Sequence, residues 1–342
     1  MKIGIHHARG SYSEGWILYC KEKNIPYKIV NAYDTNLIHQ LDDCDIFLWH
    51  HHHANPKDVL MARQVLYSLE TLGKVVYPNW RTGWHFDDKV GQKYLLEGHA
   101  LPLIPSYVFY SKVEAMKWLD TADFPFVFKL RGGAGSYNVK LVKTRRKAIS
   151  LIRRSFGKGF RQIDPITDFK ERFRKYRLGH SSMGELLKAI AHIVIPYQIE
   201  KSKGRERGYF YAQDFIPNCK DDIRVQMIGD KGYAMKRHVR QGDFRASGGG
   251  NIDYDGFKIP MEAIEISQMV ERKLEMQSMA IDLLSYRDTY LIAEVSYAFA
   301  IDDDELDFGY FDSELKWHKE VFNPFGWLIE DLIIQFEKKV KF

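Results

Sequence analysis

Short apolar runs separated by polar loops indicate alternating strands and helices in the first hundred residues. Lys2–Ile5 and Asp45–Trp49 are apolar enough for buried strands, and each is followed by loop residues and then by helical spacing. A strand, a helix and a further strand in this order are typical of a parallel sheet. The pattern therefore predicts a small N-terminal α/β domain.

Histidines follow both predicted strands. His6 and His7 end the first strand, and the run His50–His53 ends the second. Open α/β sheets bind ligands beyond the carboxyl ends of their strands, so these side chains could meet at one sheet edge. Consecutive residues of an extended chain point alternately apart, so at most half of the run could converge. We expect a polar rim for a substrate here rather than a zinc site.

The pattern changes after the first hundred residues. Thr82–Gly98 has helical spacing and carries Asp88 and Lys89, and Pro102 and Pro105 then interrupt it. Beyond this point hairpin signals replace the strand–helix alternation, which favours an α+β region built on antiparallel sheet. We place the domain boundaries so that the domains span residues 1–103, 104–210 and 211–342.

The length and composition of the chain indicate a globular protein. A chain of 342 residues with 45% hydrophobic and 28% charged residues can bury two or three cores, which excludes a disordered or fibrous protein. The mean hydropathy is −0.37, no apolar run approaches the roughly 18 residues that a membrane helix needs, and no signal peptide is evident, so we expect a cytoplasmic protein. Cys20, Cys44 and Cys219 are scattered and fit neither a disulfide framework nor a zinc site.

Positive charge is concentrated in one segment. The net charge is +5, but Arg145–Arg207 alone holds 17 basic and 6 acidic residues. Its basic side chains could line a groove for an anionic ligand, among them Arg153, Arg154, Arg172, Arg174, Lys175 and Arg177. A solvated helical face or a mobile insertion is the alternative that we favour.

A glycine-rich turn follows the predicted strand Phe126–Leu130. The turn spans Arg131–Asn138, and Val139–Val142 returns as a second strand. Glycines let backbone N–H groups close over phosphates, and Lys129 at the base of the loop could reach phosphate oxygens. The spacing is not that of a Walker A loop, and many hairpin tips are rich in glycine only in order to turn.

The strongest candidate site is a second hairpin, predicted over Ala280–Ser296. If it is centred on Asp288, then Asp282 and Glu294 lie directly opposite on neighbouring strands, and like charges so placed destabilise a sheet unless something neutralises them. A divalent cation would do so, and Ser296 would add an oxygen on the same face. Ligands that are all oxygen suit Mg²⁺. The alternative is a carboxylate pair that is neutralised by arginines.

A further hairpin is predicted between these two. Asp222–Ile228 and Tyr233–Arg237 read as strands on either side of a tight turn. Its cations are Lys236 and Arg237, and Arg240, Arg245 and the glycine-rich run Ser247–Asn251 follow, so anionic groups could be held here. An ordinary basic hairpin is the alternative.

In this order, the segments from residue 86 to residue 296 resemble the ATP-grasp superfamily, in particular its ribosomal-protein glutamate ligase and glutathione synthetase type. The series that carries the resemblance is Asp88-Lys89, Lys129 before the glycine-rich loop, Gln213–Ile216, Asp222-Ile-Arg224, Phe244–Ser247, Asp282 and Glu294-Val-Ser296. The resemblance implies a pre-ATP-grasp α/β domain followed by a two-lobed ATP-grasp domain.

The resemblance also implies roles for individual residues. The nucleotide would be bound by Lys89, Lys129, Lys236, Asp222 on the ribose side, and Gln213, Asp214 and Phe215 at the adenine. Arg245 would stabilise phosphoryl transfer, and Asp282, Glu294 and Ser296 would hold two Mg²⁺ ions, with Mn²⁺ as a substitute. Positions 296 and 247 depart from the pattern, because both carry serine where asparagine is usual.

The implied activity is ATP-dependent ligation of a carboxylate to an amine through an acyl phosphate. Such phosphoryl transfer needs positioning and neutralised charge rather than a side-chain nucleophile. An aromatic, acidic segment follows Ser296. Its combination with the ATP-grasp series resembles ATP-grasp proteins encoded among surface-polysaccharide enzymes, which suggests a sugar acid as substrate. Packing of a terminal helix near Trp327–Phe336 is the favoured explanation of these aromatics.

Two alternatives belong to other classes. A nucleotide-binding pseudoenzyme or regulatory module is suggested by Ser296, and a nucleic-acid binder by the basic segment, although aromatics are not interleaved with its charges. The expected partners are ATP and small or glycan-linked acids and amines. A homodimer is left open.

Overall fold

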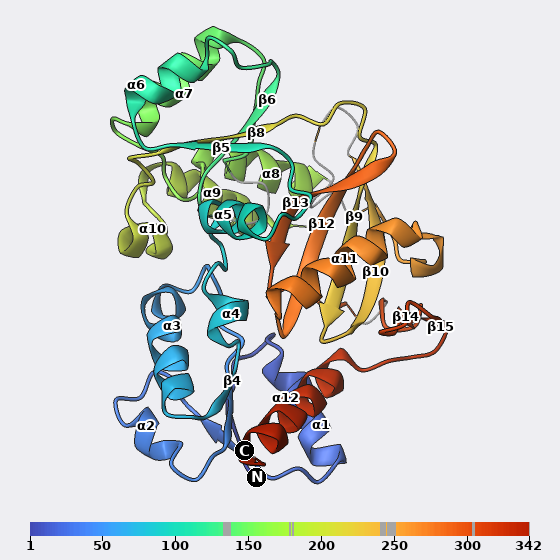
Figure 1. The fold of residues 1–342 in the computed structure, drawn as a ribbon. Helices are drawn as coiled ribbons and strands as arrows, with labels where there is room; N and C mark the ends of the chain where they lie inside the picture. Colours follow the sequence, from blue (N-terminus) through green and yellow to red (C-terminus); the bar gives the residue numbers. More distant parts are fainter. Residues whose placement is uncertain are drawn as a thin grey trace. The chain divides into compact units, whose positions relative to one another are not determined.

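The computed structural model describes residues 1–132, 138–177, 179, 181–239, 244, 251–302 and 305–341. They fall into two compact units, one formed by residues 1–86, 221–238 and the described residues from 251 onward, the other by residues 87–220 and the described residues from 239 to 250. Figure 1 traces the chain through both units. None of the helices in these ranges is both long and apolar enough to cross a membrane.

The N-terminal part of the first unit is the predicted α/β domain. Its parallel sheet has the strand order β2-β1-β3-β4, with β1 at Ile3–His6, β2 at Tyr27–Val30, β3 at Ile46–Leu48 and β4 at Val75–Tyr77. The connecting helices are α1 (Ser13–Glu22), α2 (Leu37–Gln40), α3 (Pro56–Thr71) and α4 (Trp80–Gly83). Strands β1, β3 and β4 are buried along their whole length, as short apolar runs in a parallel sheet should be.

The rest of the first unit is an antiparallel sheet. Its strand order is β13-β12-β9-β10-β14-β15, with β11 paired to β10. The strands are β9 (Asp221–Ile228), β10 (Lys231–His238), β11 (Ile252–Asp253), β12 (Ser278–Tyr286), β13 (Thr289–Ser296), β14 (Tyr310–Phe311) and β15 (Trp317–His318). Helix α11 (Met261–Leu274) lies across this sheet in Figure 1, and the short helix η1 (Gly256–Lys258) precedes it. Both predicted hairpins, β9–β10 and β12–β13, are confirmed.

Helix α12 (Pro324–Val340) completes the first unit and confirms the predicted terminal helix. It packs against α1 and β4, and the Tyr19 hydroxyl donates to Glu330 Oε1. The aromatic segment before it is mainly packing, because Phe299, Phe311 and Phe322 are buried and the Phe322 ring stacks on Trp327 at 4.9 Å. The favoured explanation of these aromatics is therefore borne out for these three side chains.

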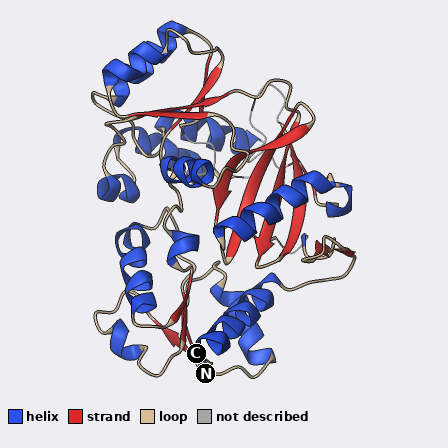
Figure 2. Ribbon diagram, in the orientation of Figure 1, coloured by secondary structure: helices blue, strands red, loops and turns tan. Residues whose placement is uncertain are grey.

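The second unit is built on an antiparallel sheet of order β5-β8-β6-β7. Its strands are β5 (Ser106–Phe109), β6 (Phe126–Lys129), β7 (Lys140–Val142) and β8 (Phe210–Asp214). Its helices are α5 (Lys89–Gly98), α6 (Lys112–Trp118), α7 (Arg145–Ser155), α8 (Pro165–Arg177), α9 (Met183–Val194) and α10 (Gln198–Lys203). Figure 2 shows the elements of both units by type.

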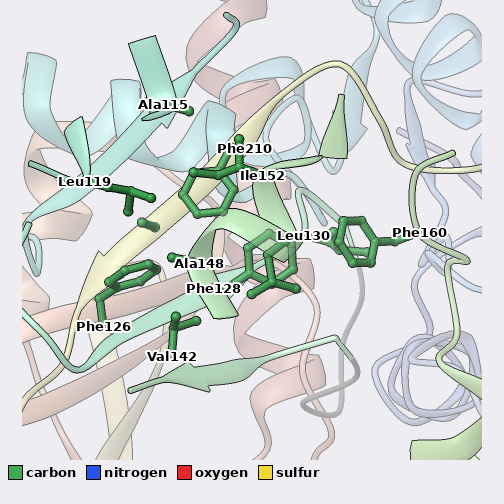
Figure 3. Close-up of a cluster of buried hydrophobic side chains, with 12 residues drawn as sticks. Ala115, Leu119, Phe126, Phe128, Leu130, Val142, Ala148, Ile152, Phe160 and Phe210 are labelled. Carbon is green, nitrogen blue, oxygen red and sulfur yellow. The ribbon is translucent and has the colours of Figure 1, made fainter. Parts of the chain in front are cut away.

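One face of this second sheet carries the core of the unit. Figure 3 shows Phe126, Phe128 and Phe210 from β6 and β8 packed with Ala148 and Ile152 of α7. Alternate residues of a strand face opposite sides, so Val127 and Lys129 of β6 and Gln213 of β8 face away from this core. The core thus fixes which side of the sheet presents Lys129 and Gln213.

Together these elements confirm the predicted fold class, an N-terminal α/β domain combined with α+β lobes on antiparallel sheets. The domain boundaries at residues 103 and 210 stay a prediction.

Candidate active site

Four charged side chains form a closed cluster on one face of the β9–β10–β12 sheet. Register places Asp222 opposite Arg237, and Arg224 opposite Asp282. Arg224 donates from Nε to Asp282 Oδ1 at 2.7 Å and from Nη2 to Oδ2 at 2.9 Å. Arg237 donates in the same two-pronged way to Asp222 at 2.6 and 2.7 Å, and its Nη2 also lies 2.9 Å from Asp282 Oδ1.

The charges in this cluster favour the ionised carboxylate more strongly at Asp282 than at Asp222. Burial would raise the pKa of Asp282, but Arg224 and Arg237 outweigh it and hold that pKa well below its usual range. Burial and the nearby Asp282 charge raise the pKa of Asp222, although Arg237 opposes them. Two guanidinium groups balance two carboxylates, so the cluster is neutral when all four groups are charged.

Glu294 lies directly opposite Asp282 on β13, as the hairpin argument predicted. The register shifts between Asp282 and Leu283, because Leu283 pairs with Ile292 and leaves Ala293 as the extra residue of a bulge. The turn at the hairpin tip falls on Arg287 and Asp288, and Arg287 has a positive φ of 54°. Glu294 therefore reaches its place opposite Asp282 through a bulge and not through an unbroken ladder.

The remaining predicted residues of this sheet are less close to the cluster. Ser296 pairs with Ala280, two residues along the strands from the Asp282–Glu294 pair. Its hydroxyl donates to the Ala298 carbonyl at 2.8 Å. Lys236 neighbours Arg237 on β10 and therefore faces the opposite side of the sheet. Arg245 and Ser247 lie outside the described residues.

The second unit holds the other predicted residues. Asp88 caps α5 by accepting from the Gly91 N–H at 2.9 Å, and it also accepts from Arg131 Nη2 at the start of the glycine-rich segment. The backbone N–H of Lys89 donates to the Arg131 carbonyl at 2.8 Å. The α5 N-terminus is thus attached to the end of β6 that carries Lys129, and residues 133–137 of the loop lie outside the described residues.

Strand β8 carries the segment predicted to contact adenine. Gln213 is buried and its amide donates to Ser106 Oγ at 3.1 Å. Gln213 pairs with Val127 on β6, so it shares a sheet face with Lys129. Asp214 lies on the other face, where burial and then Asp123 raise its pKa, and the Phe215 ring lies 6.3 Å from that of Phe244.

Solved structures resemble this arrangement over nearly the whole chain. One is a RimK domain protein ATP-grasp from Sphaerobacter thermophilus, with a TM-score of 0.57 at 13% identity over 97% of this chain and 100% of that one. A second is the D-alanine--D-alanine ligase of Bacillus anthracis complexed with ATP, with a TM-score of 0.54 at 16% identity over 99% and 97%. The chain has the ATP-grasp fold.

A third neighbour with the ATP-grasp fold is the ligase PsnB, solved with a minimal precursor, Mg and ADP. It has a TM-score of 0.52 at 12% identity and covers 98% of both chains. No protein-family model and no curated protein sequence matches the chain. The predicted resemblance is thereby confirmed at the level of the fold.

The residues of this chain partly fit the magnesium that the ATP-grasp fold implies. A carboxylate has about four lone-pair sites, and the three arginine contacts leave one site on Asp282 Oδ2. Asp282 can thus offer one further oxygen contact beside Glu294. The arginine-paired alternative is also realised at Asp282. Among the described residues, no group of three or more His, Cys, Asp or Glu side chains is placed to hold a metal ion.

The histidines of the run His50–His53 lie partly in the interior and partly at the surface. His51 is buried beside Tyr297, whose hydroxyl donates to the His51 carbonyl at 2.7 Å, and the His50 ring stacks on Tyr12 at 3.8 Å. Burial lowers the pKa of both imidazoles to about 3, so both are neutral near pH 7. His7 and His52 are exposed. The two packed imidazoles, His50 and His51, are consecutive residues of a loop after β3, so the alternation expected of an extended chain does not describe this run.

The basic segment forms helices α7 to α10, and its arginines are largely engaged. Arg172 pairs with Asp168 and Glu185, Arg174 with Glu171, and Arg161 with Glu200. These contacts agree with the favoured solvated helical face and leave fewer cations for a groove that binds anions.

The sequence analysis did not predict that Arg224 and Arg237 both bind Asp282, an arrangement that we call the arginine clamp. It also did not predict a role for Glu305. Glu305 is buried and accepts from Gln226 Nε2 at 2.8 Å, and Gln226 is the next residue after Arg224 on that sheet face. Extending the hairpin register to a third strand would have revealed Arg224. No local pattern marks Glu305, because its contact comes from a loop distant in sequence.

Proposed function

We propose that the chain is an ATP-dependent ligase that joins a carboxylate to an amine and releases ADP. The observation that carries the proposal is the pairing of Asp282 with Glu294 on a sheet of an ATP-grasp fold. Further support comes from the solved neighbours, which are a D-alanine--D-alanine ligase complexed with ATP and the ligase PsnB complexed with Mg and ADP.

In this proposal Asp282 and Glu294 hold Mg²⁺, and Ser296 contributes directly or through water. The metal would neutralise charge on the ATP phosphates. Arg224 and Arg237 fix the orientation of the Asp282 carboxylate, so that its remaining lone pair keeps one direction. The arginines keep Asp282 ionised across the physiological range, as a metal ligand must be.

Residues that the resemblance assigns to the nucleotide occur in each unit. Lys89 and Lys129 would contact phosphates, and Gln213, Asp214 and Phe215 would line the adenine. Lys236 faces the side of its sheet opposite Asp282 and is therefore left out of this phosphate site. Asp222 would serve the ribose side, although its bond to Arg237 has to be shared with that role. Arg245 would stabilise the transferring phosphoryl group. The carboxylate would attack the γ-phosphorus to give an acyl phosphate, and the amine would then displace phosphate to form the amide.

The acid substrate is proposed to be a sugar carboxylate. The proposal is supported by the aromatic, acidic segment that follows Ser296, where Phe308 and Trp317 are not fully buried. Aromatic faces stack well on sugar rings.

The test is release of ADP and phosphate with Mg²⁺ and ATP against pooled sugar acids, other carboxylates and amines, with mass spectrometry of the products. ADP together with an adduct lighter by one water is the expected result. Glu294→Gln should abolish ADP release, because the metal loses a charged ligand. Glu265→Gln, an exposed position on α11, is the matched control. Full activity of Glu294→Gln would overturn the metal assignment.

A nucleotide-binding pseudoenzyme is the second candidate, favoured by the arginine clamp that already neutralises Asp282. It predicts that the chain binds ATP and releases no ADP in any pool.

A further inference from the structure

A buried carboxyl group, that of Glu305, lies on the sheet face that carries Asp282. Glu305 is 4% exposed and accepts from Gln226 Nε2 at 2.8 Å. Gln226 is two residues after Arg224 on β9, so the two side chains leave one face of the sheet at a spacing of about 7 Å. Arg224 in turn binds Asp282. Glu305 is therefore near the proposed metal ligands and belongs to the same unit.

Two further polar atoms beside this carboxyl group are buried and have no hydrogen-bond partner among the described residues. They are Gln226 Oε1 and the Tyr233 hydroxyl. Gln226 is fully buried and Tyr233 is 3% exposed, and the two residues lie directly opposite each other on β9 and β10. Opposite side chains of antiparallel strands have Cβ atoms about 5 Å apart. A buried polar atom without a partner costs stability, so a ligand that donates hydrogen bonds here would bind favourably.

The charge of Glu305 is not matched by an ion pair in the part of the chain that the structure describes. Arg224 already donates to a carboxylate with two of its nitrogens, and Lys231 places its Nζ 5.4 Å from the centre of the Trp327 ring. Burial raises the pKa of Glu305 to about 7, and the negative charge of Asp302 adds to this effect while Arg224 opposes it. A cation beside Glu305 would be stabilised, whereas an anion would be repelled.

A primary ammonium group matches these atoms in number and charge. It has three N–H donors, and the cluster offers three acceptors, namely the Glu305 carboxylate, Gln226 Oε1 and the Tyr233 oxygen. The Tyr233 hydroxyl stays neutral, because burial and then the charge of Glu305 raise its pKa. A water molecule donates only two hydrogen bonds and leaves the carboxylate charge unmatched. The chemistry of the cluster thus favours an organic ammonium ion as the ligand.

We propose that Glu305, Gln226 and Tyr233 bind the ammonium group of a primary amine, and that this amine is the substrate of the ligase. The assignment to the substrate rests on the proposed function. Its basis is position, because the three side chains lie on the sheet face of Asp282 and Glu294, where the acyl phosphate would form. Secondary and tertiary amines offer fewer N–H donors to the three oxygens, so we expect primary amines to be preferred.

Binding of methylammonium chloride tests the subsite without any turnover. A ligand of two non-hydrogen atoms reaches a Kd of about 10 mM at best, so about 100 mM is needed. At pH 8, above the Glu305 pKa of about 7, this should raise the melting temperature by at least about 1 °C. The same concentration of tetramethylammonium chloride, which has no N–H donor, should not.

Three variants show where methylammonium binds. Glu305→Gln removes the charge and Tyr233→Phe removes one acceptor oxygen, and each should lose most of the methylammonium shift. Tyr233→Phe keeps the ring, whose centre lies 4.9 Å from that of Phe322, so the fold should be retained. Glu314→Gln, at an exposed position of the same unit, is the matched control and should keep the full shift.

A second assay connects the subsite to the ligase reaction. Hydroxylamine is a neutral nucleophile at pH 8 that converts an acyl phosphate to a hydroxamate and needs no ammonium site. With an acid that the chain activates, Glu305→Gln should form the hydroxamate at the rate of the unmodified chain. The same variant should raise the KM for a primary amine at least about tenfold, because the ammonium group loses its charged partner.

The subsite and the proposed function fail in different ways. The absence of a methylammonium shift, or a shift of equal size in Glu305→Gln, would overturn the subsite even if ADP release confirms the ligase. So would hydroxamate formation together with an unchanged amine KM in Glu305→Gln. A methylammonium shift that Glu305→Gln abolishes, without hydroxamate from any acid, would support the ammonium site but overturn its assignment to a ligase substrate.

Discussion

Arg237 joins two carboxylates, Asp222 and Asp282, and Arg224 forms an ion pair with Asp282. Arg237 is bidentate to Asp222 and also contacts Asp282, and its side chain is only 7% exposed. Removing one member of a buried ionic cluster leaves an uncompensated charge. Arg237 is therefore a structural residue as well as a neighbour of the proposed metal ligand.

Replacing Arg237 with methionine should lower the free energy of unfolding by roughly 3–5 kcal/mol, measured by urea denaturation at pH 7. Arg81→Met, which breaks an exposed pair with Glu275 in the same unit, should cost less than about 1 kcal/mol. Equal losses in the two variants would contradict the buried-cluster interpretation.

Glu305 makes stability depend on pH in the opposite sense to a typical carboxylate. Burial raises its pKa from 4.5 to about 7. The folded chain therefore binds this proton more tightly than the unfolded chain, so the contribution of Glu305 to stability is greatest below about pH 4.5 and is lost as the pH rises through 7. Glutamine keeps an oxygen for Gln226 and cannot ionise.

Glu305→Gln should therefore raise the free energy of unfolding by about 2–3 kcal/mol at pH 8 and change it little near pH 4.5. Urea titrations across this range would measure it, with exposed Glu314→Gln as the control. A gain of equal size at both pH values would mean that the carboxyl has no raised pKa.

At the residue scale, the sequence was most informative where a feature depends on local spacing. The pairing of Asp282 with Glu294 was expected from a hairpin centred on Asp288 and is observed, but it depends on the bulge at Ala293, because the turn is centred between Arg287 and Asp288. The arginine clamp needs the third strand, β9, which pairs with β12 across more than fifty residues of chain. No short-range pattern fixes that register.

At the scale of elements, Gln277 joins the two sheets of the first unit. Its side chain accepts from the Asn79 N–H at 2.8 Å and donates to the Val76 carbonyl at 2.9 Å, and its backbone N–H donates to Thr82 Oγ1 at 2.9 Å. Tyr77 on β4 reinforces the junction with a 2.7 Å bond to Ser278. The start of β12 is thereby anchored to the end of β4.

Gln277→Leu should lower the free energy of unfolding by about 2–4 kcal/mol, because two backbone groups lose their partner in a buried place. Urea denaturation would measure it, with exposed Gln198→Leu as the comparison. A loss below that of Gln198→Leu would show that water replaces these bonds.

The elements themselves were predictable where periodicity is strong. The strands at the N-terminus, the three hairpins and the terminal helix all occur near their predicted places. The partners of β8 were not predictable, because it lies between β5 and β6, roughly a hundred residues earlier in the chain. Pairing at this distance is decided by packing of Phe210 against the core of the second unit and not by local preference.

At the scale of the whole molecule, the chain leaves the first unit near residue 87 and returns at residue 221. The proposed phosphate-binding residues Lys89 and Lys129 belong to the second unit, and the proposed metal ligands Asp282 and Glu294 belong to the first. Binding of ATP with Mg²⁺ is measurable without any turnover.

Mg²⁺ with ATP should raise the melting temperature of the chain, since a ligand that binds only the folded state stabilises it by about 2.7 kcal/mol at a hundred times its Kd. Lys129→Met should remove most of this shift while leaving the unliganded melting temperature nearly unchanged, because Lys129 faces away from the core of its unit. Lys112→Met, exposed on α6, should keep the full shift. A shift that survives in Lys129→Met would exclude that lysine from the phosphate site, whereas a normal shift without ADP release in any substrate pool would favour the pseudoenzyme.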